Sequence, residues 1–600
     1  MQHTIPPRSE VDPRYTWAIT DLFPSDEAWR EAYAQAAGLI DRLRGFQGRL
    51  SESGAVLLDF LRQYDDLARA LEPLAGYAFR RSDEDTRNAV YQEMSAQVQN
   101  LLVRVDEATA FETPEILAIG DETMDTFFRA VPALEHYRLL LTRIRRQREH
   151  TLSHEGEALL AAAGKLGQAP DEIFGFLNDA DLRFPDAEDR AGKRHPVTHG
   201  TYIPLMQSDD RALRASAFRS LYGVYGQFRN TSAAILSAQM NQLQFFANAR
   251  RYPSALHAAL DQTEVPVEIY RNLIAAVHSH LPAMHRYVRL RKRLLGVDKL
   301  HYYDLYTPMV ASGTDKIPFE EAKQIALEGL APMGEEYLSI LREGFSHRWI
   351  DVYENQGKRS GAYSSGIYGS HPFVLLNYTD TLNDVFTLVH EMGHALHSYL
   401  SNQAQSVTYA DYVIFVAEVA STCNEALLMQ HLLSTTDDPQ RRAYLINYFL
   451  EQFRTTLYRQ TMFAEFELWC SEQVRGGNAL TAEALSGKYA ELNRAYYGDE
   501  IEPDREIALE WARIPHFYYN FYVYQYATGF ACAIALSQRI LREGAPAVSD
   551  YLHFLRGGCS ADPVSLLRGA GVDIASPAPV EDALALFDQL IGEMESLTES

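Results

Sequence analysis

Apolar residues recur every three to four positions along most of the chain, which is the spacing of amphipathic α-helices. The N-terminal part predicts helices over Ser25–Leu43, Gly54–Leu71 and Thr86–Glu107, and helical signals continue over Asp209–Arg342. Helical patterns also dominate the C-terminal part, and no tandem repeat is evident. The pattern therefore predicts a mainly α fold.

Two segments depart from this helical pattern. A strand at Asp181–Pro185, a polar turn and a second strand at Pro196–Ile203 together resemble a hairpin. We place a boundary there, with an N-terminal helical region at 1–184, the hairpin at 185–203 and a second helical region at 204–600. The other departure is Gly357–Tyr378, where a Gly- and Ser-rich stretch leads into a β-like segment at Phe373–Tyr378. It predicts a small sheet with a mobile loop.

Composition and charge exclude several classes of protein. The 600 residues are 46% hydrophobic and 22% charged, which is typical of a folded protein large enough to enclose a deep cleft. A net charge of -25 disfavours binding to nucleic acids and anionic membranes, and we interpret it as solvated helix faces. No apolar run is long enough to span a membrane or to form a leader, so we expect a cytoplasmic protein. The four cysteines form no C-x-x-C pair, which predicts buried reduced thiols rather than a disulfide framework or a thiolate metal site.

The segment His390-Glu-Met-Gly-His394 carries the strongest chemical signal. Residues four apart project from one face of a helix, so His390 and His394 can share one ion, and zinc suits imidazole ligands. Glu391 can then reach a water molecule at the metal as a general base. A match to this motif arises by chance in roughly one chain in twenty of this size. The apolar residues around it and Gly393, which allows close packing, favour a buried functional helix. Asp380 or Thr381 would cap its start.

A catalytic zinc site needs a third protein ligand, and two residues are candidates. His397 lies on nearly the same helix face, but it stands about 10 Å along the axis from His390. Glu418 is a carboxylate within an apolar helical run, 24 residues after His394, and a connection at Ser401–Asp411 can bring it back to the metal. A donor from another helix is favoured, and a structural ion pair is the alternative for Glu418. Glu425 is seven residues further on the same face, where it can accept a hydrogen bond from a ligand imidazole or remain solvated.

These motifs resemble the thimet-oligopeptidase family of zinc peptidases, and most closely its oligoendopeptidase F branch. The resemblance rests on H-E-M-G-H-A-L-H-S and F-V-A-E-V-A-S-T-C-N-E, and it extends over nearly the whole chain. Further matching segments are Trp17–Pro24, His199–Leu205, Gly357–Tyr363, His371–Val385 and Arg459–Glu467. The resemblance implies one zinc ion per chain, Glu418 as the third ligand, and a helical body enclosing a deep substrate channel, with the small sheet next to the zinc helix.

A tyrosine-rich segment, Arg513–Gly529, is the candidate for stabilising an oxyanion. On a helix, Tyr519, Tyr522 and Tyr526 would share one face, although a packed aromatic helix is the alternative interpretation. The resemblance implies that His516, Tyr519 and Tyr526 bind substrate and stabilise the tetrahedral intermediate. His516 stands closer to the first tyrosine than in the mammalian-type members, and Tyr522 is a competing assignment that could also contact substrate.

An exposed strand edge near the zinc helix could bind the backbone of an extended peptide, with Phe373, Leu375 and Asn377 as contact residues. An ordinary structural strand is the alternative. The predicted function is zinc-dependent hydrolysis of short oligopeptides, without nucleic-acid or membrane partners. A helical binding or chaperone-like protein with an inert motif, and an H-E-x-x-H hydrolase with a different third ligand, are the other hypotheses.

Overall fold

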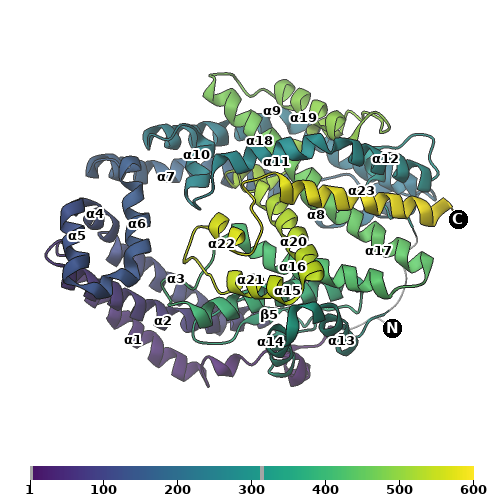
Figure 1. Ribbon diagram of the computed structural model, residues 1–600. Helices are drawn as coiled ribbons and strands as arrows, with labels where there is room; N and C mark the ends of the chain where they lie inside the picture. Colours follow the sequence, from purple (N-terminus) through teal and green to yellow (C-terminus); the bar gives the residue numbers. More distant parts are fainter. Residues whose placement is uncertain (1–4, 311–315, 600) are drawn as a thin grey trace. The chain divides into compact units, whose positions relative to one another are not determined.

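The computed structural model of the chain describes residues 5–310 and 316–599. Helices account for 72% of the chain and the sheets are small, so the predicted mainly α fold is confirmed (Figure 1). The chain forms two compact units that alternate along the sequence. Unit 1 comprises Met1–Glu149, Asp315–His431 and Leu536–Gly571, and unit 2 comprises His150–Thr314, Leu432–Ala535 and Val572–Ser600.

Unit 1 contains the N-terminal helices and the H-E-x-x-H helix. Its helices are α1 (Asp26–Arg44), α2 (Gly54–Glu84), α3 (Ala89–Thr109), α4 (Glu112–Ala118), α5 (Asp121–Ala130), α6 (Arg138–Arg146), α13 (Phe319–Gly329), α14 (Gly334–Ser346), α15 (Leu382–Ala404), α16 (Ile414–Thr435), α21 (Ala545–Leu555) and α22 (Pro563–Gly569). The last residues of α16 belong to unit 2. A core built largely from α1, α2 and α3 also includes Phe373 and Leu375 of the small sheet.

Unit 2 contains the longest helix and the tyrosine-rich segment. Its helices are α7 (His154–Gly175), α8 (His199–Met206), α9 (Arg211–Ala249), α10 (Ala255–Asp261), α11 (Val267–Ser279), α12 (Leu281–Leu294), α17 (Pro439–Gln452), α18 (Arg459–Arg475), α19 (Ala482–Tyr497), α20 (Tyr524–Glu543) and α23 (Ala578–Glu599). The end of α20, from Leu536, belongs to unit 1.

The predicted N-terminal helices are present, with one extended further than expected. Ser25 caps α1 because its hydroxyl accepts a hydrogen bond from the Ala28 N–H at 3.3 Å. The helix predicted to end at Leu71 continues through Pro73 to Glu84. The apolar face of α2 persists beyond the proline, since Leu74, Tyr77 and Ala78 are buried, and tertiary packing overrides the local signal to stop.

The hairpin between the two sequence regions is shorter than predicted. β1 (Ala187–Glu188) and β2 (Arg194–His195) pair antiparallel, but Asp181–Pro185 is not a strand. The second predicted strand, Pro196–Ile203, is wrong, because helix α8 begins at His199. Thr198 and Thr201 form a capping box there, in which each side chain hydrogen-bonds to the backbone of the other. The boundary predicted at 185–203 stays a prediction.

A three-stranded sheet in unit 1 lies beside the H-E-x-x-H helix, as predicted. Its order is β3-β5-β4, where β3 (Ile350–Asp351) is parallel to β5 (Phe373–Leu375) and β4 (Tyr363–Ser365) is antiparallel to it. β4 packs on α15, where Gly366 approaches Ser398 so closely that a Cβ would lie 2.5 Å from the serine Cβ. Strand β3 was not predicted, and a run of two residues carries no periodicity to detect.

The predicted peptide-binding edge at Phe373–Tyr378 is wrong. Strand β5 is central and has a partner on each side, so its backbone is already paired. Phe373 and Leu375 are fully buried in the core of unit 1. The Asn377 amide donates hydrogen bonds to the backbone oxygens of Arg359 and Gly361, at 3.0 and 2.8 Å, and so holds the Gly-rich loop. Burial and strand pairing therefore give Phe373 and Leu375 a structural role, and the two hydrogen bonds give one to Asn377.

Two further findings bear on the expected class of protein. Cys423, Cys470 and Cys532 are buried free thiols, and Cys559 is a half-buried one. In the part of the chain that the structure describes, no helix combines the length and apolarity that a membrane crossing requires. The enclosing substrate channel stays a prediction.

Candidate active site

Helix α15 starts at the predicted cap. The Thr381 hydroxyl accepts a hydrogen bond from the Asp384 N–H at 3.2 Å, and the Asp384 carboxylate accepts one from the Thr381 N–H at 2.9 Å. This reciprocal pair fixes the first turn of α15 two turns before the histidines. The following residues Val385, Leu388 and Val389 are fully buried. The helix is therefore anchored by its cap and by its apolar face.

Helices α15 and α16 touch through their backbones at Gly393. A Cβ at this position would lie 2.6 Å from the Ser421 Cα and 2.9 Å from the Ala420 carbonyl oxygen. The Asn424 amide of α16 also donates a hydrogen bond to the Val389 carbonyl of α15 at 3.2 Å. The absence of a side chain at Gly393 brings the two helices together, and this contact places α16 beside the two histidines.

His390, His394 and Glu418 come together as the sequence predicted. Each offers one ligand atom, and these atoms all lie within 4.8 Å of one another. The Glu418 Oε2 atom is 3.4 Å from Nε2 of His390 and 3.6 Å from Nε2 of His394, and the Ser421 hydroxyl donates a hydrogen bond to this oxygen at 3.0 Å. All three ligand side chains are half-buried. Two imidazoles and a carboxylate are a donor set that suits a catalytic zinc ion.

Glu425 holds the ring of His390. Its Oε1 atom is 2.6 Å from His390 Nδ1, so this nitrogen carries the proton and Nε2 is left for a metal. Burial lowers the pKa of His390. The hydrogen bond and charge of Glu425, with the charges of Glu418 and Glu391, outweigh this effect and raise the pKa overall. The partnership predicted from the i+7 spacing of Glu418 and Glu425 is thus present in the geometry.

His397 lies outside this cluster of three donors. Its ring stacks on that of Tyr412 with a centroid distance of 3.7 Å, and it makes a tilted contact with Phe554 of α21 at 5.6 Å. The side chain is buried, and burial together with His394 lowers its pKa to about 3. This neutral ring acts as a packing element between α15 and α21.

Glu391 is buried beside the three candidate ligands. Only 7% of its surface is exposed, and burial raises its pKa to about 7. The backbone of Ser364 in β4 lies close to the carboxylate and favours its charged form. In an antiparallel pair the N–H and C=O of one residue point to the same side. Ser364 therefore turns its backbone groups away from β5 and toward Glu391, and the outer edge of β4 borders the cluster.

A cavity of about 500 Å³ adjoins this edge within unit 1. It is lined by Ser364 of β4, Ser398 of α15, Arg80 of α2 and Tyr412, which precedes α16. No sequence pattern indicated Ser364, Arg80 or Tyr412. Ser364 fell in a stretch interpreted as a mobile loop, and Arg80 lies on an ordinary amphipathic helix without any motif. Only the pairing of β4 with β5 and the packing of α2 bring these residues to the cavity.

The predicted aromatic residues of unit 2 also form a cluster, but not on a helix face. The 3₁₀-helix η11 (Pro515–Tyr518) ends before Tyr519, and α20 begins only at Tyr524. The ring of His516 lies 5.5, 6.3 and 5.9 Å from those of Tyr519, Tyr522 and Tyr526. Tyr522 and Tyr526 are 5.2 Å apart. A turn gathers the four rings, so the predicted shared helix face is wrong although the grouping is right.

This turn depends on two residues in the left-handed region. Asn520 and Phe521 have φ values of 54° and 58°, which non-glycine residues seldom adopt. The N–H of Phe521 donates a hydrogen bond to the buried carboxyl of Glu467 at 2.7 Å. Burial raises the pKa of Glu467 to about 8. This buried contact holds the strained turn and with it the positions of Tyr519 and Tyr522.

Comparison with known proteins identifies the family. The model of Peptidase family M3 matches residues 204–586, and the model described as Oligopeptidase F matches residues 115–184. Oligopeptidase PepF of Bacillus subtilis is 46% identical over 593 residues, which cover 99% of this chain and 88% of the relative. Group B oligopeptidase PepB of Streptococcus agalactiae is 40% identical, with 98% of each chain covered. The crystal structure of oligoendopeptidase-F from Enterococcus faecium has 39% identity and a TM-score of 0.75, covering 96% of this chain and 99% of that one.

The family model covers more than half of the chain, and the full-length relatives agree with it. Its members are metallopeptidases, and the donor set of His390, His394 and Glu418 fits a metal ion. The chain therefore belongs to peptidase family M3, in its oligoendopeptidase F branch, and is a metalloendopeptidase.

Proposed function

We propose that this protein hydrolyses short oligopeptides with one zinc ion, held by His390, His394 and Glu418, and with Glu391 as the general base. The observation that carries the proposal is the convergence of three donor atoms within 4.8 Å beside a buried glutamate. Zinc bound there would supply Lewis acidity, which makes a water molecule more acidic and polarises the scissile carbonyl. Glu425 would keep the His390 ring in the tautomer that presents Nε2.

Glu391 takes the proton in this proposal. Its pKa of about 7 reflects burial, and a cation nearby would lower it, so that the carboxylate is the form present at neutral pH. The carboxylate removes one proton from the water molecule while the water oxygen bonds to the peptide carbon. The same proton then passes to the amide nitrogen as the C–N bond breaks, and a free amine leaves.

The aromatic cluster of unit 2 is proposed to stabilise the oxyanion. Tyr526, with Tyr519 or His516, would donate hydrogen bonds to the developing negative charge, and one such donor contributes about 2–4 kcal/mol. Burial and the charge of Arg459 lower the pKa of His516, so its ring is neutral and can act as a donor. Tyr522 remains a candidate for the same role or for substrate contact, because its ring is in the same cluster.

Short, extended peptides fit this proposal because the outer edge of β4 offers backbone groups next to Glu391. Pairing with a substrate backbone there gives affinity that depends little on substrate side chains. The adjoining cavity of about 500 Å³ can take one side chain of the peptide. We therefore expect cleavage of many sequences. The cytoplasmic location stays a prediction.

The test of the base compares the wild type with Glu391→Gln. We expect zinc content near one ion per chain in both proteins, and a loss of at least about 10³-fold in kcat for a quenched ten-residue peptide in the variant. Removal of the metal by a chelator should abolish activity, and zinc should restore it. Equally slow cleavage by wild type and variant would instead favour the helical binding protein with an inert motif.

The third ligand is tested by Glu418→Ala and His397→Ala side by side. Glu418→Ala should lose zinc and activity together, because it removes one of three ligand atoms. The His397→Ala protein should retain zinc and lose mainly stability, because the His397 ring of the wild type packs between Tyr412 and Phe554. The reverse pattern would assign the third ligand to His397.

A further inference from the structure

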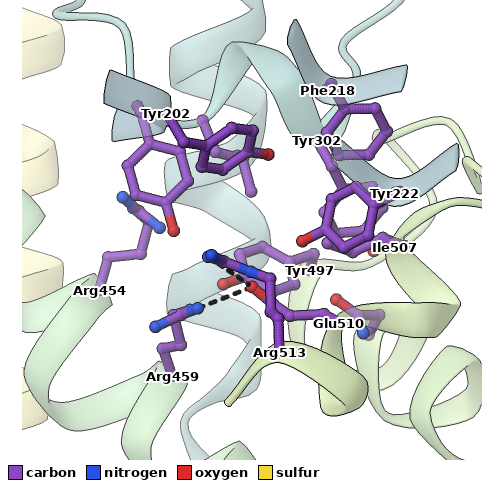
Figure 2. A pocket seen from close by; sticks show the side chains of 13 residues that line it. Tyr202, Phe218, Tyr222, Tyr302, Arg454, Arg459, Tyr497, Ile507, Glu510 and Arg513 are labelled. Atoms are coloured by element: carbon purple, nitrogen blue, oxygen red, sulfur yellow. Dashed lines mark hydrogen bonds and ion pairs between the residues drawn. The ribbon is translucent and has the colours of Figure 1, made fainter. Parts of the chain in front are cut away.

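Unit 2 encloses a second cavity, far smaller than the one beside β4. Its volume is about 20 Å³, which is enough for one water molecule or one ion of similar size. Figure 2 shows the guanidinium groups of Arg454, Arg459 and Arg513 around it, together with tyrosine side chains from α8 and α9. Only one carboxylate, that of Glu510, belongs to the lining. A small buried space is thus surrounded by positive charge.

The hydrogen bonds of these arginines leave donors unused. Arg459 donates to Glu510 at 2.7 Å, and Arg454 donates to Glu451 at 2.7 and 3.0 Å. Arg513 comes no nearer than 3.7 Å to Glu510, and its Nε–H is buried without a hydrogen-bond partner. Burying a guanidinium N–H without an acceptor is unfavourable, so an acceptor in the cavity would remove this cost.

The surrounding charges do not balance. Glu451 forms ion pairs with both Arg454 and the fully buried Arg291. Glu510 forms ion pairs with both Arg459 and Arg513. The other polar partners of Arg291 are neutral, since they are the Tyr287 hydroxyl and two backbone carbonyls. Four guanidinium groups therefore share two carboxylates.

Asp304, whose backbone carbonyl accepts a hydrogen bond from Arg291, does not correct the excess. Asp304 is fully buried, and it already pairs with Arg211 and Arg214. Within a chain whose net charge is -25, this part of unit 2 holds a local surplus of cations. Low-dielectric surroundings make such a surplus costly unless an anion accompanies it.

Tyrosine hydroxyls complete the set of donors. Tyr202 and Tyr222 are buried, and both line the cavity together with Arg513 (Figure 2). The Arg513 side chain also lies over the Tyr202 ring at 5.1 Å. Burial raises the pKa of both tyrosines, so both keep their protons at neutral pH and can donate. Guanidinium and phenol groups around a small cavity form a donor shell for an acceptor that carries negative charge.

We infer that this cavity binds one small monovalent anion of the size of chloride. The volume of the cavity admits one ion of that size. The inference goes beyond the proposed function, since the anion would lower the surplus positive charge of a buried cluster without taking part in peptide hydrolysis. It does not depend on the metal centre.

Chloride is the probe in the test. The zinc-loaded protein is transferred to sodium gluconate, whose anion is too large for the cavity, and chloride then replaces gluconate at constant ionic strength. We expect the unfolding temperature to rise with chloride along a saturable curve. Crystals soaked in sodium bromide should show one anomalous peak between Arg454, Arg459 and Arg513.

Arg513→Gln removes the arginine with the unpaired N–H and should raise the chloride concentration for half of the effect by at least about tenfold. Arg494→Gln is the matched control, because Arg494 lies on α19 in the same unit and its side chain is 76% exposed. It should leave the curve unchanged. If Arg513→Gln does not fold, the bromide experiment on the wild type decides alone.

Three results would overturn the inference. The first is equal stabilisation by chloride and gluconate, the second is an unchanged chloride curve in a folded Arg513→Gln protein, and the third is an empty cavity in the bromide-soaked crystals. Hydrolysis of the ten-residue peptide is measured in the same gluconate buffer. Loss of anion binding with intact hydrolysis would refute this site and leave the proposed function standing.

Discussion

Replacement of Gly393 by alanine tests the arrangement of the metal centre directly. The new Cβ would lie 2.6 Å from the Ser421 Cα and 2.9 Å from the Ala420 carbonyl oxygen. Ordinary contacts between such atoms are about 3.5–4.0 Å, so α15 and α16 would have to separate by about 1 Å. Both contacts are with backbone atoms, which no side-chain rotation can relieve.

The expected cost follows from this clash. Overpacking in a well-packed core destabilises by about 1–3 kcal/mol, and a backbone clash belongs at the upper end. Alanine stabilises a helix by about 1 kcal/mol relative to glycine, so we expect a net loss of about 2 kcal/mol. The separation also moves Glu418 relative to His390 and His394. A displacement of about 1 Å in a catalytic constellation can cost about 10²-fold in rate.

The assay combines urea unfolding, zinc content and hydrolysis of the quenched peptide. Gly393→Ala should unfold at lower urea, bind zinc more weakly and lose about 10²-fold in kcat/KM. The control is Gly223→Ala on α9, an exposed helical glycine with no neighbouring atom within 4 Å of the place that a Cβ would take, which should be neutral or slightly stabilising. A Gly393→Ala protein with unchanged stability and activity would refute the close contact between α15 and α16.

Three other substitutions test separate parts of the structure. Glu425→Gln weakens the hydrogen bond to His390 Nδ1 and should lower zinc affinity by about 10–100-fold in a chelator competition, and unchanged affinity would contradict its role. Asn377→Ala removes two hydrogen bonds to the Gly-rich loop and should lower the unfolding free energy by about 1–3 kcal/mol, whereas a rise in KM alone would restore a role in peptide binding. Glu467 has a folded-state pKa of about 8 against 4.5 when exposed, so its contribution to stability is complete below pH 4.5 and is lost as the pH rises toward 8. Over that range the unfolding free energy of the wild type should fall by up to about 1.4 kcal/mol per pH unit relative to that of Glu467→Gln. Parallel stability curves of the two proteins would show that burial does not perturb this carboxyl.

The sequence was informative where a short local pattern determines the structure. The helix period, the cap at Thr381 and the spacing of His390 and His394 are all local, and they correctly predicted α15 and its donor pair. The position of Glu418 beside them followed from the helix turn and the family resemblance. Strand order was not accessible, because β3 pairs with β5 across more than twenty residues and has only two residues itself. The prediction for Phe373 and Leu375 failed for this reason.

The aromatic segment shows a second limit. Helical spacing grouped Tyr519, Tyr522 and Tyr526, whose rings do lie near one another, but the chain there forms a turn with two left-handed residues. Its stability comes from Glu467, which is more than fifty positions away and which no local pattern connects with Phe521. A contact of that range can be recognised only when the fold is known.

The alternation of the two units along the chain has a consequence for synthesis on the ribosome. Helix α15 is complete at Ala404, but α21, which packs against it, begins about 140 residues later at Ala545. Phe554 covers His397, and the Arg556 carbonyl accepts a hydrogen bond from Gln405. A chain that ends before Ala545 therefore carries His390 and His394 without the packing that fixes their helix. We expect peptide hydrolysis to arise only after α21 has been synthesised, so that a chain still lacking this helix stays inactive.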